Sequence, residues 1–375
     1  MSISYLLDEK TGSETWKNLY VNNLTVNGTL TTDGGSRTVA KTFVYGDSLG
    51  VFPTVPLSWP TKYAGLYPNA GTVTNKCVNG LTIQTACPVI NNDIANSVIQ
   101  SGNDAIVWLG YNNWSNQSYT DYQVRNLAQS ICSFAMSLIL KPTSFRLSDP
   151  NLTHSATIIN TEAPAIPLIG DAGIQTTVPL AGNTQWVQLS NINTRYVYVQ
   201  FMINSSSTEQ QLYCTWSIDG SSTESTSVQL PNEIPNLQFY PFDLLIDRGE
   251  SKIGVTTELK INNFVGSPNN VTTRWMFYKC FDTIPTDRCT VVSPWNTWNT
   301  STHALGTPQL LAGVDFVLRN TVKSYSDRGF NMRYAEIPTP LSGDMNGEGS
   351  ITVHPSSNFT PVLAKAIGDV ALSAS

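Results

Sequence analysis

Residues 42–50 read TFVYGDSLG, and residues 105–113 read AIVWLGYNN. In each stretch a short apolar run, Phe43–Tyr45 or Ala105–Leu109, ends at a glycine followed by polar side chains. Such runs are typical of strands buried within an α/β sheet. Polar groups at the carboxyl ends of such strands lie at the edge where open α/β sheets bind ligands. The two stretches therefore predict an α/β domain with a polar site at one edge of its sheet.

Further helices and strands of an α/β pattern are expected before residue 150 and after residue 286. Apolar residues recur with helical spacing from Val124 to Leu138, and Pro142 stands just beyond the end of that helix. The later expected elements are a strand over Cys289–Ser293, a helix over 308–326, a strand over Phe330–Tyr334 and a helix from about Pro361.

Residues 150–286 have no helical period and are predicted to be all-β. Strand-like runs such as Trp186–Leu189 and Tyr196–Ile203 alternate with turns rich in Ser, Thr, Asn and Gly. Short strands at this spacing are typical of a β-sandwich or jelly roll. Because the α/β pattern resumes afterwards, we predict a sandwich inserted into one α/β domain, whose parts are residues 41–149 and 287–375.

Residues 1–40 are predicted to form a separate stem. From Leu19 they read LYVNN-LTVNG-TLTTDG, short alternating units that end in Asn-Asn or Asn-Gly turns. A unit this short cannot bury its own apolar face, so we expect it to trimerise or to anchor the protein. The alternative is a flexible pair of strands. The segment resembles the N-terminal stems of viral and phage surface fibres.

Composition excludes several classes of function. The 375 residues carry 13% charged side chains and a net charge of −6, which excludes nucleic-acid binding driven by charge. No apolar run reaches the roughly 18 to 20 residues that span a bilayer. The opening MSISYLLDEK has neither a basic region nor a long apolar stretch, so no cleavable signal peptide is expected. A protein made without a signal that acts outside a cell fits a virus or phage particle.

The six cysteines include no CxxC pair, which argues against a zinc site. Cys77 and Cys87, and likewise Cys280 and Cys289, are close enough in sequence for short disulfides, with buried free thiols as the alternative. We expect neither a metal nor a cofactor.

Four polar positions stand at expected element ends. They are Ser48 in Gly46-Asp47-Ser48-Leu49, Gly80 in Asn79-Gly80-Leu81-Thr82, Asn112 in Gly110-Tyr111-Asn112-Asn113, and His354 in Val353-His354-Pro355-Ser356. Taken singly, each has an ordinary explanation as a helix cap, a turn or a solvated side chain. Together, their order and spacing resemble the conserved blocks of the SGNH (GDSL-type) hydrolase family.

That resemblance covers about residues 42–148 and 287–375 and implies a flavodoxin-like three-layer α/β fold. It implies that Ser48 is the nucleophile and His354 the general base. It also implies an oxyanion hole made by the Ser48 and Gly80 N–H groups and the Asn112 side chain. There are two departures from the family pattern.

The departures concern the acidic residues. Asn113 stands where the family has Asp, and Ile351 occupies the place of the Asp three residues before the base. Asp344 or Glu348 could orient His354 instead, or a main-chain carbonyl could do so. A Ser-His pair with an intact oxyanion hole still catalyses without the acid, although more slowly.

We therefore expect a serine esterase that removes O-acyl groups, O-acetyl in particular, from a surface carbohydrate on a virion or phage tail. The expected partners are a glycan, other virion or capsid proteins, and sister chains in a homo-oligomer, with a trimer favoured. The alternative is a catalytically degenerate structural or receptor-binding virion protein, which the missing acid favours. A secreted cellular esterase is disfavoured because no signal peptide is expected.

Alternation in one strand of the β block suggests a sugar site. Tyr196 and Tyr198 share one face, and Val197 and Val199 share the other. If the valines face the core, the tyrosines form an exposed ledge on which sugar rings can stack. If the tyrosines face inward, the block is structural or forms an interface.

Overall fold

A computed structural model describes residues 37–114, 121–154, 174–178, 185–205, 211–218, 222–229, 240–265, 271–293, 308–338, 344–348 and 351–374. The chain divides into two units, Met1–Gly35 and Ser36–Ser375, and all of these residues belong to the second. The repeats of the predicted stem lie outside the described residues.

The helical elements are η1 (Ser48–Gly50), η2 (Val55–Leu57), α2 (Trp59–Leu66), η3 (Pro68–Ala70), α3 (Ile83–Ala95), α4 (Tyr111–Trp114), α5 (Asp121–Leu140), η4 (Glu250–Lys252), α6 (Pro308–Asp327) and α7 (Thr360–Ala371). The strands are β1 (Lys41–Gly46), β2 (Thr72–Asn75), β3 (Asp104–Trp108), β4 (Thr143–Ser144), β5 (Leu152–His154), β6 (Ile174–Val178), β7 (Gln185–Ile192), β8 (Tyr196–Ser205), β9 (Gln211–Ile218), β10 (Ser222–Gln229), β11 (Tyr240–Asp247), β12 (Thr257–Val265), β13 (Val271–Phe281), β14 (Cys289–Val292), β15 (Met332–Ala335), β16 (Met345–Glu348) and β17 (Ile351–Pro355).

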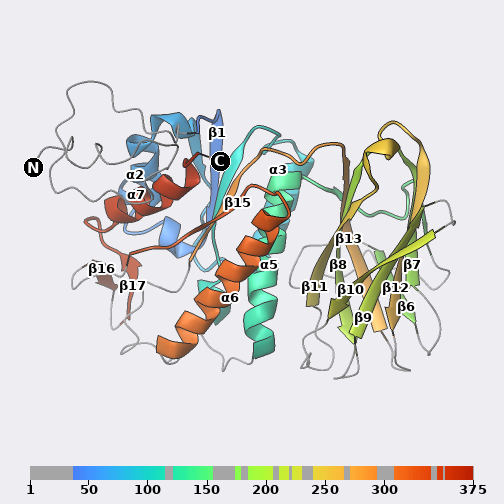
Figure 1. The fold of residues 1–375 in the computed structure, drawn as a ribbon. Helices are drawn as coiled ribbons and strands as arrows, with labels where there is room; N and C mark the ends of the chain where they lie inside the picture. Colours follow the sequence, from blue (N-terminus) through green and yellow to red (C-terminus); the bar gives the residue numbers. More distant parts are fainter. Residues whose placement is uncertain are drawn as a thin grey trace, which may run out of the picture. The chain divides into compact units, whose positions relative to one another are not determined.

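A parallel sheet of five strands in the order β2-β1-β3-β14-β15 forms the centre of the α/β part (Figure 1). Its middle strands are continuous apolar runs because helices cover both faces. Helices α2 and α7 pack together on one face, and α3, α5 and α6 cover the other. The apolar positions predicted for α5, from Val124 to Leu138, are buried, which confirms that helix.

Two antiparallel sheets lie between β3 and β14 in the chain. Their strand orders are β10-β9-β12-β7-β5 and β11-β8-β13-β4, and β6 also pairs with β13. Side chains of both sheets, including Val187, Val199, Ile261 and Trp275, share one buried core. The fold is thus mixed α/β, with the antiparallel sheets inserted between strands of the parallel one. The insertion begins at β4, before the boundary predicted at residue 150.

The outer face of β8 packs against the α/β part, which corrects the expectation that Tyr196 and Tyr198 form an exposed ledge when the valines face the core. Val197 and Val199 face the sandwich core, which is the first of the two alternatives for this strand. Tyr198, however, is 0% exposed and belongs to the apolar core of the α/β part, and Tyr196 packs beside it. The Gln200 side chain donates to Ser133 O of α5 (3.2 Å), so this face is an internal interface. The Tyr198 ring therefore cannot stack on a sugar.

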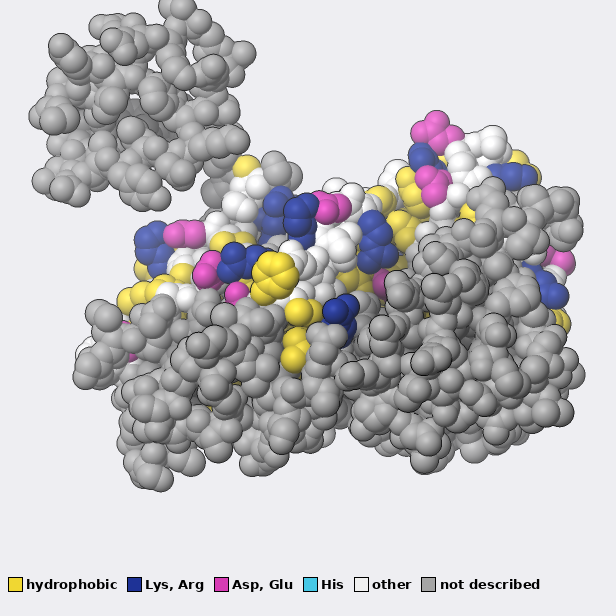
Figure 2. Space-filling model, turned by 60° about the horizontal axis from the view of Figure 1, so that its bottom comes forward, with side chains coloured by type: hydrophobic (Ala, Val, Ile, Leu, Met, Phe, Trp, Pro, Cys, Tyr) yellow, Lys and Arg dark blue, Asp and Glu magenta, His cyan; other side chains and the backbone are white. Residues whose placement is uncertain are grey.

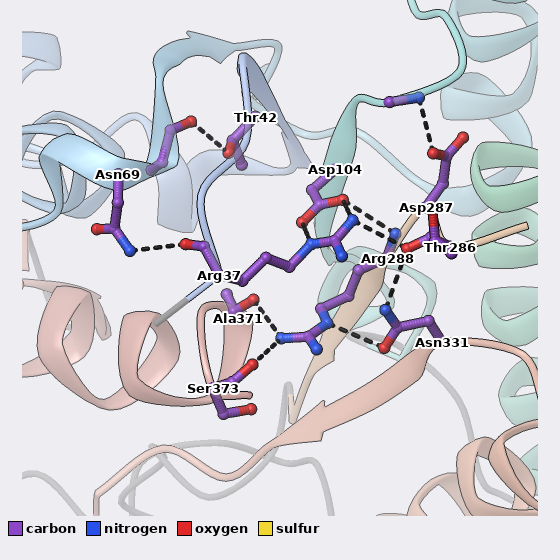
Figure 3. Close-up of polar contacts among 12 residues, drawn as sticks. Arg37, Thr42, Asn69, Asp104, Thr286, Asp287, Arg288, Asn331, Ala371 and Ser373 are labelled. Atoms are coloured by element: carbon purple, nitrogen blue, oxygen red, sulfur yellow. Dashed lines mark hydrogen bonds and ion pairs between the residues drawn. The ribbon is translucent and has the colours of Figure 1, made fainter. Parts of the chain in front are cut away.

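A partly buried charge network joins the amino edge of the sheet to both ends of the described chain (Figure 3). Arg37 makes two hydrogen bonds to the Asp104 carboxylate, of 2.6 and 2.7 Å. The Arg288 N–H donates to the same carboxylate, and the Arg288 guanidinium donates to Ala371 O and Ser373 O. Residues just before β1 are therefore tied to the α/β part, although the predicted stem extended to residue 40.

Three further features of the described residues concern membrane spans, metal ligands and cysteines. Within the described ranges, no helix is long and apolar enough to cross a bilayer, and no three His, Cys, Asp or Glu side chains are grouped as metal ligands. Neither Cys77 with Cys87 nor Cys280 with Cys289 forms a disulfide; all four are thiols. Among the coloured residues of Figure 2, Lys and Arg side chains lie interspersed with Asp and Glu.

Candidate active site

Ser48 lies where the order of the parallel sheet changes direction. It follows β1, whose neighbours β2 and β3 lie on opposite sides, and this carboxyl edge is where such sheets bind ligands. Ser48 begins η1, and the Asp47 carboxylate caps this turn by accepting from the Leu49 N–H at 3.0 Å. The cap holds Ser48 at the end of the strand.

The turn around Ser48 is tight enough to require glycine. A Cβ atom on Gly50 would lie 2.2 Å from the Cys77 sulfur, and one on Gly46 would lie 2.9 Å from it. Asn75 of β2 also holds this turn, because its side chain donates to Gly50 O at 2.9 Å. The segment after β2 therefore fits directly against the Ser48 turn.

His354 reaches Ser48 from the far end of the chain. It lies on β17, which pairs with β16 as a hairpin, and its Nε2 is 3.0 Å from Ser48 Oγ across 306 residues of sequence. This is the hydrogen-bond distance that a general base needs to take the serine proton. For Nε2 to accept that proton, Nδ1 must carry the other one.

The hairpin register separates the two candidate acids. Asn346 is opposite His354 and Met345 is opposite Pro355, and the Ser356 N–H donates to Asp344 O at 2.7 Å. Asp344 and His354 are therefore diagonal neighbours on one face of the hairpin, a spacing that side chains can bridge. Glu348 pairs with Ile351 beyond a register shift, and its side chain lies outside the described residues.

Besides the Ser48 N–H, the two other predicted oxyanion donors, Gly80 and Asn112, lie on the neighbouring loops. The Val78 N–H donates to Gly46 O at 3.0 Å, which places the loop leading to Gly80 beside the end of β1. Gly80 is exposed and has a φ of 71°, and a Cβ atom there would meet nothing within 4 Å. Its surroundings therefore leave room for a substrate.

Asn112 follows β3, the strand next to β1, and ties these loops together. Its side-chain amide donates to Leu81 O at 3.0 Å. Asn113, the residue that departs from the family pattern, accepts from the N–H of Ile83, the first residue of α3, at 3.0 Å. It thus caps a helix and holds the Gly80 loop against α4.

Burial raises the pKa of two groups beside Ser48, the Asp47 carboxyl and the Cys77 thiol. Asp47 is 0% exposed, and burial raises its pKa to about 7. Its Oδ2 has no hydrogen-bond partner among the described residues. Burial also raises the pKa of the Cys77 thiol well above its ordinary value. Cys77 is therefore a neutral thiol and does not compete with Ser48 as a nucleophile.

Phe52 is a site residue that the sequence analysis missed. Its ring stacks on the His354 imidazole, with centroids 3.9 Å apart and planes 23° apart. The only signal in the sequence is that Phe52 stands four residues after Ser48. That spacing does not predict contact with a histidine from the other end of the chain.

Comparisons with known proteins give similarity in structure only. No protein-family model and no curated protein sequence matches the chain. The porcine torovirus hemagglutinin-esterase is similar with a TM-score of 0.40 and 12% identity, over 88% of this chain and 87% of that one. A two-domain esterase active on acetylated mannans matches with a TM-score of 0.29 and 9% identity, over 66% of this chain and 92% of that one. A xylan-binding domain from Paenibacillus barcinonensis matches with a TM-score of 0.26 and 13% identity, over 38% and 94%.

Proposed function

We propose that this chain is a serine esterase of SGNH type that cleaves O-acyl esters through an acyl-serine intermediate. The observation that carries the proposal is the 3.0 Å contact between Ser48 Oγ and His354 Nε2. A hydroxyl and an imidazole held this way form the activated nucleophile of acyl-transfer enzymes. Packing alone does not require such a pair at the edge of a sheet where ligands bind.

The sheet supports the same assignment. The order β2-β1-β3-β14-β15 corresponds to the 2-1-3-4-5 order of flavodoxin-like sheets, with helices on both faces. Ser48 and Asn112 follow β1 and β3, the two strands that flank the switch point. Both features are expected of the fold that the SGNH resemblance implies, and they support the proposal.

In the proposed reaction, His354 Nε2 takes the Ser48 proton as Ser48 Oγ attacks the ester carbonyl carbon. The tetrahedral oxyanion receives hydrogen bonds from the Ser48 and Gly80 N–H groups and the Asn112 amide. As the carbon–oxygen bond of the ester breaks, the His354 imidazolium gives its proton to the departing alkoxide. Water then attacks the acyl-serine with His354 again as base, which releases the acid and restores Ser48.

Asp344 is our candidate for the group that orients His354. Its diagonal position on the hairpin supports this role, because a carboxylate there can accept the Nδ1 proton of the imidazole. The hairpin thus offers an acid at a place different from Ile351, where the family pattern has it. What favours the alternative, a degenerate receptor-binding protein, is that Ile351 occupies the place of the acid.

The proposed substrate is an O-acyl group, O-acetyl in particular, on a surface carbohydrate. The proposed setting is a virion or phage-tail surface, where residues 1–40 would join sister chains, as a trimer, or other particle proteins. These parts of the proposal rest on the sequence patterns.

A fluorophosphonate probe tests the reaction. We expect it to label the wild-type chain at Ser48, and to label Ser48→Ala and His354→Ala weakly or not at all. Ser357→Ala is the matched control, since Ser357 is an exposed serine just after β17, the strand that carries the base. A wild-type chain that is neither labelled nor able to hydrolyse p-nitrophenyl acetate would favour the receptor-binding alternative.

A further inference from the structure

The contact between Phe52 and His354 adds a residue to the site beyond nucleophile, base and oxyanion donors. The two rings stack at 3.9 Å between centroids, and both residues are half-buried. The stack covers one face of the imidazole and not its edge, so Nε2 still reaches Ser48 Oγ. The ring of Phe52 therefore limits rotation of His354 without occupying either nitrogen.

The main chain around Phe52 is held on both sides. The Phe52 N–H donates to Ser48 O at 3.0 Å, so Phe52 is tied to the nucleophile turn itself. Further along, Thr360 Oγ1 of α7 donates to Leu57 O at 2.8 Å. One segment thus links the nucleophile, the stacked ring and the helix that follows the base.

The face of a phenyl ring carries partial negative charge and attracts a cation lying over it. In the proposed reaction His354 becomes an imidazolium as Ser48 attacks. The attraction to Phe52 is then stronger in the transition state than in the resting enzyme, and only such an interaction accelerates the chemical step.

We propose that Phe52 is a positioning residue, which fixes the ring plane of His354 and stabilises its protonated form during ester hydrolysis. The inference rests on the proposed function. It extends that function, because Phe52 would supply stabilisation that the family obtains in part from the acid missing at Ile351.

Titratable residues also stand on the elements next to His354. Asp344 and Glu348 belong to the paired arm of the hairpin, and Asp47 lies beside Ser48 on the nucleophile turn. All three residues are present in every Phe52 variant. Differences between Phe52 variants therefore report the ring and not the carboxylates.

The sharpest variant replaces Phe52 with pentafluorophenylalanine. The fluorinated ring keeps nearly the same shape and excludes the same water, but its face no longer attracts a cation. Phe52→Leu is harder to interpret, because it has two opposing effects on the His354 pKa. Loss of the aromatic ring lowers the pKa, whereas water admitted to the imidazole stabilises the imidazolium and raises it. Phe52→Trp keeps an aromatic face over the imidazole and should retain ester hydrolysis.

The first readout is the pKa of His354 by NMR titration, which needs no activity. The chain has three histidines, so His354→Gln assigns the signal. We expect pentafluorophenylalanine to lower the His354 pKa by about half a unit to one unit. Trp at the same position should keep the pKa at or above the wild-type value.

The second readout is ester hydrolysis as a function of pH. For the fluorinated variant we expect kcat to fall about 3- to 10-fold with KM little changed, and the acid limb of kcat/KM to move to lower pH. The control is Phe316→Leu, which removes a phenylalanine that is 64% exposed on α6 and should change neither readout.

An active fluorinated variant with wild-type kcat and wild-type His354 pKa would overturn the role of Phe52 and leave the esterase proposal intact. A wild-type chain that hydrolyses no ester would overturn the esterase proposal and the catalytic role of Phe52. In that case a lowered His354 pKa in the fluorinated variant would still establish the interaction between the rings.

Discussion

Replacing Asp47 by Asn should remove a stability cost that grows with pH. Asp47 is fully buried, and burial raises its pKa from 3.8 to about 7. The protonated carboxyl is therefore the form that the fold prefers. The free energy of unfolding of the wild type should therefore be highest below the unfolded-state pKa near 3.8. It should fall as the pH rises from there through about 7, and level off above that.

The size of the effect follows from the two pKa values of 3.8 and about 7. A difference of about 3 pKa units corresponds to about 4 kcal/mol, at about 1.36 kcal/mol per unit. This is an upper value, reached above pH 7. Asn is the close neutral analogue, because its Oδ1 can still accept from the Leu49 N–H. Asp47→Asn should thus approach wild-type stability at pH 4 and exceed it by up to about 4 kcal/mol at pH 8.

Urea unfolding of wild type and Asp47→Asn at pH 4, 5.5, 7 and 8 measures this difference. Asp327→Asn is the control, since the Asp327 side chain is 61% exposed on α6 and its replacement should give a nearly constant difference across the pH range. Parallel pH profiles for wild type and Asp47→Asn would refute the reasoning, because they would mean that the buried carboxyl does not titrate in this range.

Three further predictions concern the hairpin, the charge network and the nucleophile turn. Asp344→Asn should lower kcat for ester hydrolysis at least about 100-fold, whereas Glu348→Gln should leave it within about 2-fold; the reverse order would assign the orienting acid to Glu348. Asp104→Asn should lower the free energy of unfolding by about 3 kcal/mol while kcat per folded molecule stays unchanged, because the carboxylate lies at the amino edge of the sheet (Figure 3). Gly50→Ala should lower the thermal midpoint and weaken fluorophosphonate labelling because of the clash with Cys77, and Cys77→Gly should restore part of both; an additive double mutant would contradict this.

Much of the α/β part could be predicted from the sequence because its signals are local. Helical spacing from Val124 to Leu138 and a helix expected over 308–326 correspond to α5 and α6. The Gly-Asp-Ser turn after a short apolar run likewise predicts where Ser48 stands on its strand. These features depend on residues within one or two helical turns of each other, so a single sequence contains them.

The tertiary structure alone decided which of these local features meet. Alternation in β8 separates Val197 from Tyr198, but only the packing of α5 against that strand shows that the tyrosine face is covered. In the same way, only the register of the hairpin distinguishes Asp344 from Glu348. Phe52 reaches His354 because the hairpin, α7 and the Ser48 turn pack together, although the chain between the two rings is long. Contacts of this kind depend on the folding of distant segments onto one another, and spacing along the chain carries no record of them.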